Sequence, residues 1–228
     1  MSQTGVVSWL AVRELWISFR LLALLGAYVG VGALVALLPA PGSTAMTRLS
    51  VGLAAAIIVG AAIAAGALAS ERVLGRAGWL VTRSISRGTV VVGWFVAVAG
   101  VSLIGLMAAA ALGWLAASPS VVQLQPAPFA AIVGGVAAQA LALISIGLLL
   151  GTLLPPVPAA GAALVAGVGV AATSYFVLPD ALSPLAALAA LPSLDRPVAA
   201  GVQGAGIGLA STAVALVLAR MALGRVDL

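Results

Sequence analysis

Acidic side chains are the groups in this sequence best suited to acid–base or metal chemistry. There are five of them: Glu14, Glu71, Asp180, Asp195 and Asp227. Histidine and cysteine are absent, which removes the commonest general base, the commonest metal ligand and all thiol chemistry. None of the five carboxylates stands inside a long apolar stretch, and they do not cluster as metal ligands do. The sequence therefore predicts no catalytic residue, no metal site and no cofactor.

A few amide and hydroxyl side chains do stand within the apolar stretches. Gln139, Ser145 and Gln203 are candidate contacts for a molecule that passes between helices. Gln139 is the most notable, because an amide in hydrocarbon must find a hydrogen-bond partner. The alternative interpretation is that these side chains only make hydrogen bonds between helices.

The elements that would position these residues are membrane spans. The 228 residues are 64% hydrophobic and 7% charged, with a mean hydropathy of +1.28, whereas a soluble domain carries roughly 25% charged residues. A span needs about 20 apolar residues to cross about 30 Å of hydrocarbon. The stretches that satisfy this are 21–38, 51–69, 89–115, 129–150, 159–177 and 198–221. The sequence therefore predicts an all-α, polytopic membrane protein of six spans, forming one domain over residues 1–228.

The arginines predict how the spans are oriented. With six spans, the arginines that fall on one side are Arg13, Arg20, Arg72, Arg76, Arg83, Arg87, Arg220 and Arg225. Only Arg48 and Arg196 fall on the other side. Because loops rich in basic residues stay in the cytoplasm, we predict cytoplasmic termini in a bacterial plasma membrane. Arginines that flank apolar segments also indicate membrane lipid, and not nucleic acid, as their partner.

The N-terminal segment, residues 1–20, predicts an interfacial helix. Its apolar stripe consists of Val12, Leu15, Trp16 and Phe19, extended by Trp9. Such a stripe flanked by arginines is typical of a helix that lies in the membrane surface. A simple helical extension of the first span is the alternative.

The segment 179–197 is predicted to be external and to contain a short helix. Ser183 followed by Pro184 indicates an N-cap with proline at the first helical position, so the helix would cover 184–191. It is too apolar for a solvated loop and too short to cross a bilayer. Both a re-entrant or interfacial helix and a loop helix that packs on the bundle fit this pattern.

The connection over residues 71–88 is the only long charged one. It contains Trp79, Leu80 and Val81, which a solvated loop does not need. We therefore predict that it packs against another protein. Contact of its arginines with lipid headgroups is the alternative.

With these features the chain resembles the membrane subunit of a type-two ABC exporter, the permease class that moves drugs, lipids and polysaccharides outward. The positions that match the family's first cytoplasmic loop are Glu71, Arg72, Gly75, Leu80, Ile85, Ser86 and Arg87, with Gly93 in the third span. The family also has short helices between its last two spans and often ends on Asp-Leu, as Asp227 and Leu228 do here. The chain differs from the family pattern in that Arg76 and Ala77 follow Gly75, and Trp94 follows Gly93.

The resemblance implies a transport subunit that is not itself an enzyme. Such a permease joins a separate ABC ATPase subunit and a second permease, identical or homologous, and moves an amphipathic or hydrophobic substrate. The ATPase-docking residues that it implies are Glu71, Arg72, Gly75, Leu80, Val81, Arg83, Ile85 and Arg87. The membrane subunit of the cytochrome c haem exporter shares the layout. A non-transporting scaffold or assembly factor, and a membrane enzyme with an unfamiliar site, also fit the sequence.

Overall fold

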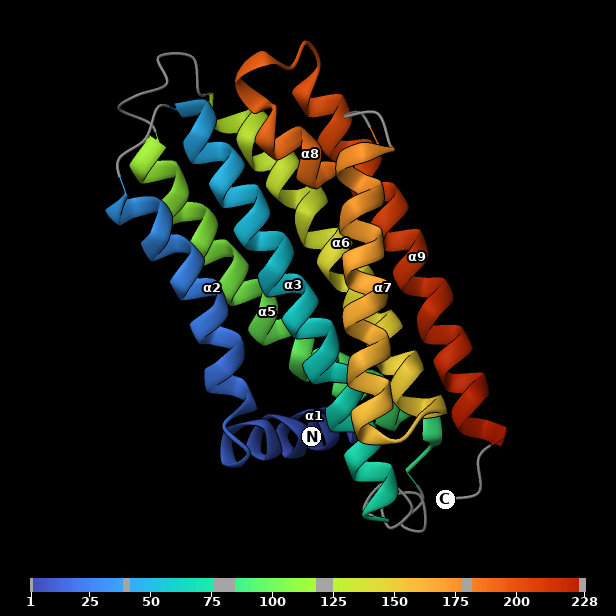
Figure 1. Ribbon diagram of the computed structural model, residues 1–228. Coiled ribbons are helices and arrows are strands. Elements are labelled where there is room, and N and C mark those ends of the chain that lie inside the picture. The colour runs from blue at the N-terminus through green and yellow to red at the C-terminus, as the bar shows by residue number, and fades with distance from the viewer. Residues whose placement is uncertain (1, 39–41, 76–84, 118–124, 178–181, 226–228) are drawn as a thin grey trace.

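Six long helices form a bundle in the computed structural model, which describes residues 2–38, 42–75, 85–117, 125–177 and 182–225 (Figure 1). They are α2 (Arg20–Leu37), α3 (Gly42–Val73), α5 (Arg87–Ala117), α6 (Pro126–Leu153), α7 (Pro156–Phe176) and α9 (Pro197–Arg225). Each is long and apolar enough to cross a membrane. The chain is therefore an all-α, polytopic membrane protein, which confirms the fold class predicted from composition.

Four of the spans, α3, α5, α6 and α9, extend beyond both of their predicted bounds, and α3 does so most, whereas α2 and α7 each end one residue early. Helix α3 begins at Gly42, whereas the prediction began near Val51. At 1.5 Å per residue its 32 residues measure about 48 Å, well beyond the hydrocarbon thickness of about 30 Å. Arg48, Glu71 and Arg72 therefore lie on the helix, and the prediction that put them in connections was wrong.

A glycine ends α3. Gly75 has a positive φ of 71°, and its N–H donates to the carbonyl of Arg72 over 3.1 Å. A left-handed glycine just after the last turn is a common way to stop a helix, because no Cβ opposes that conformation. Gly75, predicted as a docking residue, thus has a structural function at the end of α3.

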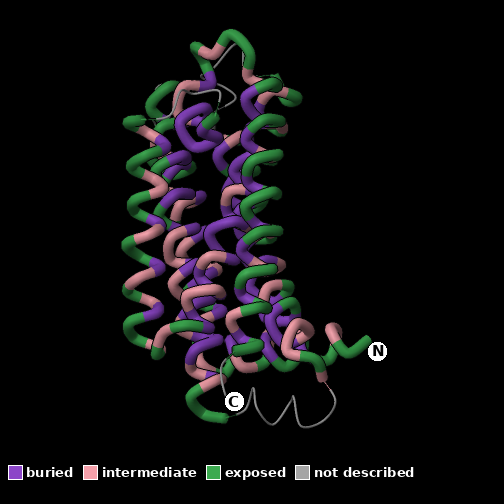
Figure 2. The backbone as a smooth tube through the Cα atoms, turned by 90° about the vertical axis from the view of Figure 1, so that its right-hand side faces the viewer, coloured by how far each residue is buried: buried purple, intermediate pink, exposed green. Residues whose placement is uncertain are grey.

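Three helices make up the centre of the bundle. The buried share of the most apolar part is 67% in α6 and 56% in α3 and α5, but 22–28% in α2, α7 and α9. Figure 2 shows the buried residues gathered along the middle of the bundle. Where α6 crosses α3, a Cβ on Gly147 would collide with the backbone carbonyl of Ala61. The glycine therefore lets the two backbones touch, as packing inside lipid requires.

The N-terminal helix α1 (Gln3–Ile17) lies across one end of the spans, at a steep angle to them (Figure 1). Its buried face consists of Val7, Ala11 and Leu15, whereas Trp9 and Trp16 are exposed. This separate helix confirms the predicted N-terminal element over the alternative of a longer first span. The predicted stripe, however, is split between two faces of α1. Leu15 lies on the buried face, whereas Trp9 and Trp16 lie on the exposed face, as suits a helix at a membrane surface.

Phe19 belongs to neither helix, because it lies at the bend between α1 and α2 with a positive φ of 59°. The prediction that placed it on the stripe of the N-terminal helix was wrong. The bend turns the chain from the surface helix into the first span.

The short helix α8 (Pro184–Ala189) and the 3₁₀ turn η1 (Leu191–Ser193) stand between α7 and α9. The backbone N–H of Ala186 donates to Ser183 Oγ over 3.2 Å, which confirms the predicted N-cap. The helix ends at Ala189, two residues before the predicted end, where η1 takes over. Residues 184–188 are buried, and α8 packs against α3, α6, α7 and α9. This short helix therefore closes one end of the bundle, opposite α1 (Figure 1).

Candidate functional site

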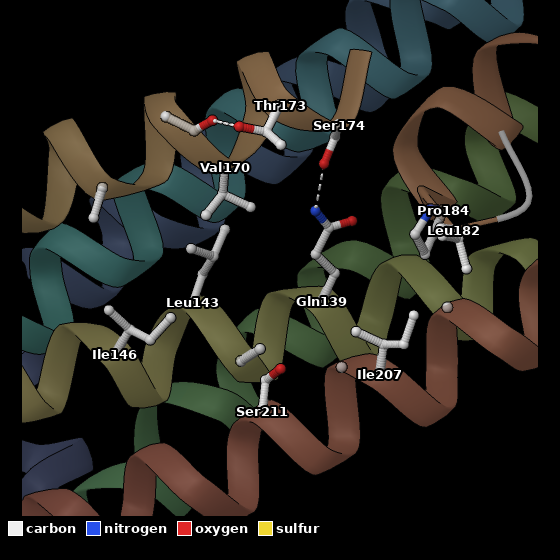
Figure 3. A pocket seen from close by; sticks show the side chains of 15 residues that line it. Gln139, Leu143, Ile146, Val170, Thr173, Ser174, Leu182, Pro184, Ile207 and Ser211 are labelled. Atoms are coloured by element: carbon white, nitrogen blue, oxygen red, sulfur yellow. Dashed lines mark hydrogen bonds between the residues drawn. The ribbon is translucent and has the colours of Figure 1, made fainter. Parts of the chain in front are cut away.

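A cavity of about 470 Å³ lies among α6, α7 and α9, with the start of α8 at one end (Figure 3). Each of the three spans contributes a stripe at positions i, i+3, i+4 and i+7, which is one face of a helix. The stripes are Gln139, Ala142, Leu143 and Ile146 on α6; Ala166, Gly169, Val170 and Thr173 on α7; Gly204, Ile207, Gly208 and Ser211 on α9. Leu182 and Pro184 form the end wall. Among the described residues, no charged side chain lines this cavity.

Gln139 extends from α6 toward α7 in this cavity (Figure 3). Its Nε2 donates to Ser174 Oγ over 3.2 Å, so the amide does make an inter-helix hydrogen bond, as one interpretation of the sequence predicted. Its Oε1 is buried and has no hydrogen-bond partner within the described part of the chain. A buried acceptor without a partner costs free energy, and such groups are rare in proteins. One end of the amide therefore bonds to α7, and the other end is a buried acceptor, unpaired in the described structure, on a residue that lines the cavity.

Ser145 and Gln203, the other two predicted pathway residues, do not line this cavity. Ser145 is buried on another face of α6 and donates to the carbonyl of Ala142 over 2.7 Å. Gln203 is exposed and stands one residue before the cavity stripe of α9. The structure therefore groups Gln139 with Thr173, Ser174 and Ser211 and leaves these two residues apart.

A hydrogen-bonded junction holds α8 at the end of the cavity. Ser50 of α3 is fully buried, and its hydroxyl donates to the carbonyl of Leu185. The hydroxyl of Tyr175 also bonds to Ser50, so α3, α7 and α8 meet at this one side chain. Sequence reasoning missed both residues, because Ser50 fell in a predicted connection and a tyrosine near the end of a span is common at membrane interfaces.

At the opposite end of the bundle, two predicted docking residues bind the chain itself. Arg72 donates through Nη1 to the carbonyl of Thr152 over 2.7 Å and through Nη2 to that of Leu154 over 2.8 Å. Arg87 donates through Nη1 to the carbonyls of Leu223 and Gly224 over 3.0 and 2.8 Å. The last carbonyls of a helix lack partners within the helix. These arginines therefore cap the C-terminal ends of α6 and α9.

The other predicted docking residues divide into two groups. Glu71 is buried with 9% of its surface exposed, and Ile85 is half-buried against the protein's own core. Leu80, Val81 and Arg83 lie outside the described residues. Contact with an ATPase at any of these positions stays a prediction.

Comparison with known proteins adds no relative: no protein-family model and no curated protein matches this chain. The fold defines the class to which the molecule belongs, an integral membrane protein with six α-helical spans in the described residues.

Proposed function

We propose that this chain is the membrane permease subunit of an ATP-driven ABC exporter that moves an amphipathic or hydrophobic substrate. The observation that carries this proposal is the uncharged cavity within the six-span bundle. A hydrophilic ion would meet no compensating charge on its described walls, so its desolvation would not be offset. Apolar walls with a few hydroxyls and one amide suit a molecule that is largely apolar.

The position of the charges favours an external source of energy. In the described spans every arginine, aspartate and glutamate stands within the first or last two turns, as Arg48 and Arg72 do in α3. Transporters driven by protons keep a carboxylate inside the membrane for that purpose. The chain also contains no lysine and hence no phosphate-binding Gly-Lys-Ser/Thr loop of its own. A separate ATPase subunit, as the family resemblance implies, would supply the energy, and a second permease copy would complete the transporter.

The distribution of arginines supports the proposed orientation. One end of the bundle holds α1 and the C-terminal end of α9 (Figure 1). Among the described residues, the arginines at this end are Arg13, Arg20, Arg72, Arg87, Arg220 and Arg225. The end with α8 carries Arg48 and Arg196. Because basic residues stay on the cytoplasmic side, we propose that both termini face the cytoplasm of a bacterium.

The test is to purify the tagged chain from its native membranes and to reconstitute whatever complex it forms. The proposal expects an ABC ATPase and a second permease in that complex. It also expects ATP-dependent movement of a fluorescent single-chain amphiphile across vesicles, with no movement of a small hydrophilic ion. An ATP-dependent ion flux would contradict the proposed substrate class. A complex without any ATPase would favour the scaffold function.

The docking hypothesis for the connection after α3 calls for variants that leave the bundle's own contacts intact. Ile85 and Arg87 contact this chain, so changing them would disturb the permease itself. The better pair is Leu80→Asp with Val81→Asp, compared with Arg83→Gln. If Leu80 and Val81 anchor the ATPase, the aspartates should weaken its association about thirtyfold while the chain still inserts, because losing a buried apolar anchor costs about 2 kcal/mol or more. If the loop instead contacts lipid headgroups, we expect the reverse: Arg83→Gln alone should have an effect, and the aspartates should leave the association with the ATPase unchanged.

A further inference from the structure

The cavity has the size and lining of a ligand site, and its polar side chains lie mainly toward one end, with Ser211 about two turns further along α9. Its volume of about 470 Å³ falls within the about 300–1,000 Å³ typical of small-molecule pockets. Gln139 and Ser174 lie toward the α8 end, beside Leu182 and Pro184 (Figure 3). Leu143 and Ile146 follow one and two turns further along α6. The cavity therefore offers a hydrogen-bonding head position and an apolar tail position along the axis of α6.

Among the described residues, the head position contains an unpaired hydrogen-bond acceptor, Gln139 Oε1. Gln139 uses its amide N–H on Ser174 Oγ, which leaves Oε1 as a buried acceptor without a partner in the described structure. The hydroxyl of Thr173, which also lines the cavity, donates to the carbonyl of Gly169 in its own helix. A ligand that fills the cavity therefore gains most by bringing a donor to Oε1, because this removes the penalty for an unmade hydrogen bond.

We propose that this cavity binds an uncharged, single-chain amphiphile whose head donates a hydrogen bond, through a hydroxyl or an amide N–H, to Gln139 Oε1. Its chain lies against Leu143, Ile146 and Val170. A charged head would be desolvated against walls that carry no charged side chain among the described residues. This inference names the substrate class of the proposed permease and so rests on that function. Binding is nevertheless a property of the chain alone and is measured without the ATPase.

The experiment is photo-crosslinking of the purified full-length chain in phosphatidylcholine nanodiscs. The probe is a monoacylglycerol that carries a diazirine near the end of its chain. The competitors share one acyl chain: 1-oleoylglycerol has hydroxyl donors, methyl oleate has acceptors only, and oleate is charged. We expect crosslinks on the tail stretch of the cavity. We expect 1-oleoylglycerol to displace the probe about tenfold better than the other two, since one hydrogen bond to a buried acceptor is worth about a factor of ten.

Three variants assign the effect to the free amide oxygen. Gln139→Leu should lower probe labelling about tenfold. Ser174→Ala removes the internal bond but keeps Oε1, so labelling should stay within about threefold of the unaltered chain. Gln203→Leu is the matched control, because it makes the same change on the exposed side of α9 and should have no effect.

Equal competition by methyl oleate, unchanged labelling in Gln139→Leu, or crosslinks that map away from α6, α7 and α9 would each overturn the proposal. The outcome is separable from that of the transport assay. If the amphiphile binds as expected but ATP drives no movement, the permease function fails and the ligand site stands. If transport occurs without labelling of the cavity, the permease function stands and this site fails.

Discussion

Helix α6 has polar groups in two places, and these differ in how completely they are hydrogen-bonded. At its C-terminal end the carbonyls of Thr152 and Leu154 both accept hydrogen bonds from Arg72. Near its middle, Gln139 pairs one end of its amide with Ser174 and leaves Oε1 without a partner among the described residues. The bonds of Arg72 are partly buried and the Oε1 of Gln139 is fully buried, so an unpaired atom costs free energy in either place. Tyr28 and Ser102 also have buried hydroxyl oxygens without a partner in the described part of the chain, but only Gln139 lines the cavity among α6, α7 and α9, so its unpaired oxygen is the one placed beside a candidate ligand.

The largest loss of stability is expected at the fully paired end. Arg72→Leu should lower the free energy of unfolding by about 3 kcal/mol, because it leaves two helix-end carbonyls without the charged donor that satisfied them. Unfolding by SDS in mixed micelles measures this change. Arg13→Leu, on the exposed side of α1, is the control and should cost less than about 1 kcal/mol. Equal losses in the two variants would show that Arg72 does not cap α6.

A smaller loss is expected at the junction that holds α8. Ser50→Ala should cost about 1.5 kcal/mol, because the carbonyl of Leu185 and the hydroxyl of Tyr175 both lose their shared partner. Ser145→Ala is the matched control, since that buried serine bonds to the backbone of its own helix and should change stability little. The same SDS titration compares them, and similar values for both serines would refute the junction.

A loss of about 1 kcal/mol is expected for Arg87→Leu. Its bond to Gly224 is exposed to solvent, so water replaces part of what the guanidinium supplies. The loss should be local. Limited proteolysis should therefore become faster at the end of α9 and change little elsewhere. Arg225→Leu, an exposed arginine at the same helix end, should leave the proteolysis rate unchanged. Global loosening of the bundle in Arg87→Leu would contradict this assignment.

The smallest effect on stability is expected at the open site. Gln139→Leu should change the free energy of unfolding by less than about 0.5 kcal/mol, because losing the bond to Ser174 is offset by removing an unpaired buried acceptor. SDS unfolding without added amphiphile measures this. A loss of about 2 kcal/mol or more would place Gln139 with Arg72, as a residue that only holds the fold.

The six spans could be predicted because long uncharged runs have few stable arrangements outside a membrane. The face that each span turns inward could not, since a helix that is apolar on every side carries no pattern that separates protein from lipid. The sequence singled out Gln139 as an amide in hydrocarbon, but it could not show which of Gln139, Ser145 and Gln203 faces a cavity, and of the three Gln139 alone lines it. The same limit applies to α1, where an apolar stripe was recognised but its tryptophans proved to face outward.

The arginines show a second limit. Their number on each side of the membrane predicts orientation, because that depends only on the order of spans and loops. Their partners depend on which helix ends meet in three dimensions. Arg72 reaches carbonyls 80 and 82 residues away, and no local pattern contains that information.

The most direct test of the ligand site is to titrate the unaltered chain and Gln139→Leu with 1-oleoylglycerol while measuring their stability to SDS. A ligand that binds only the folded chain stabilises it by an amount that grows with the logarithm of its concentration. The unaltered chain should gain about 2.7 kcal/mol at about a hundred times the dissociation constant. Gln139→Leu should need about ten times more amphiphile for the same gain. Superimposable titrations of the two proteins would contradict the claim that the open amide oxygen of Gln139 is a ligand-binding group.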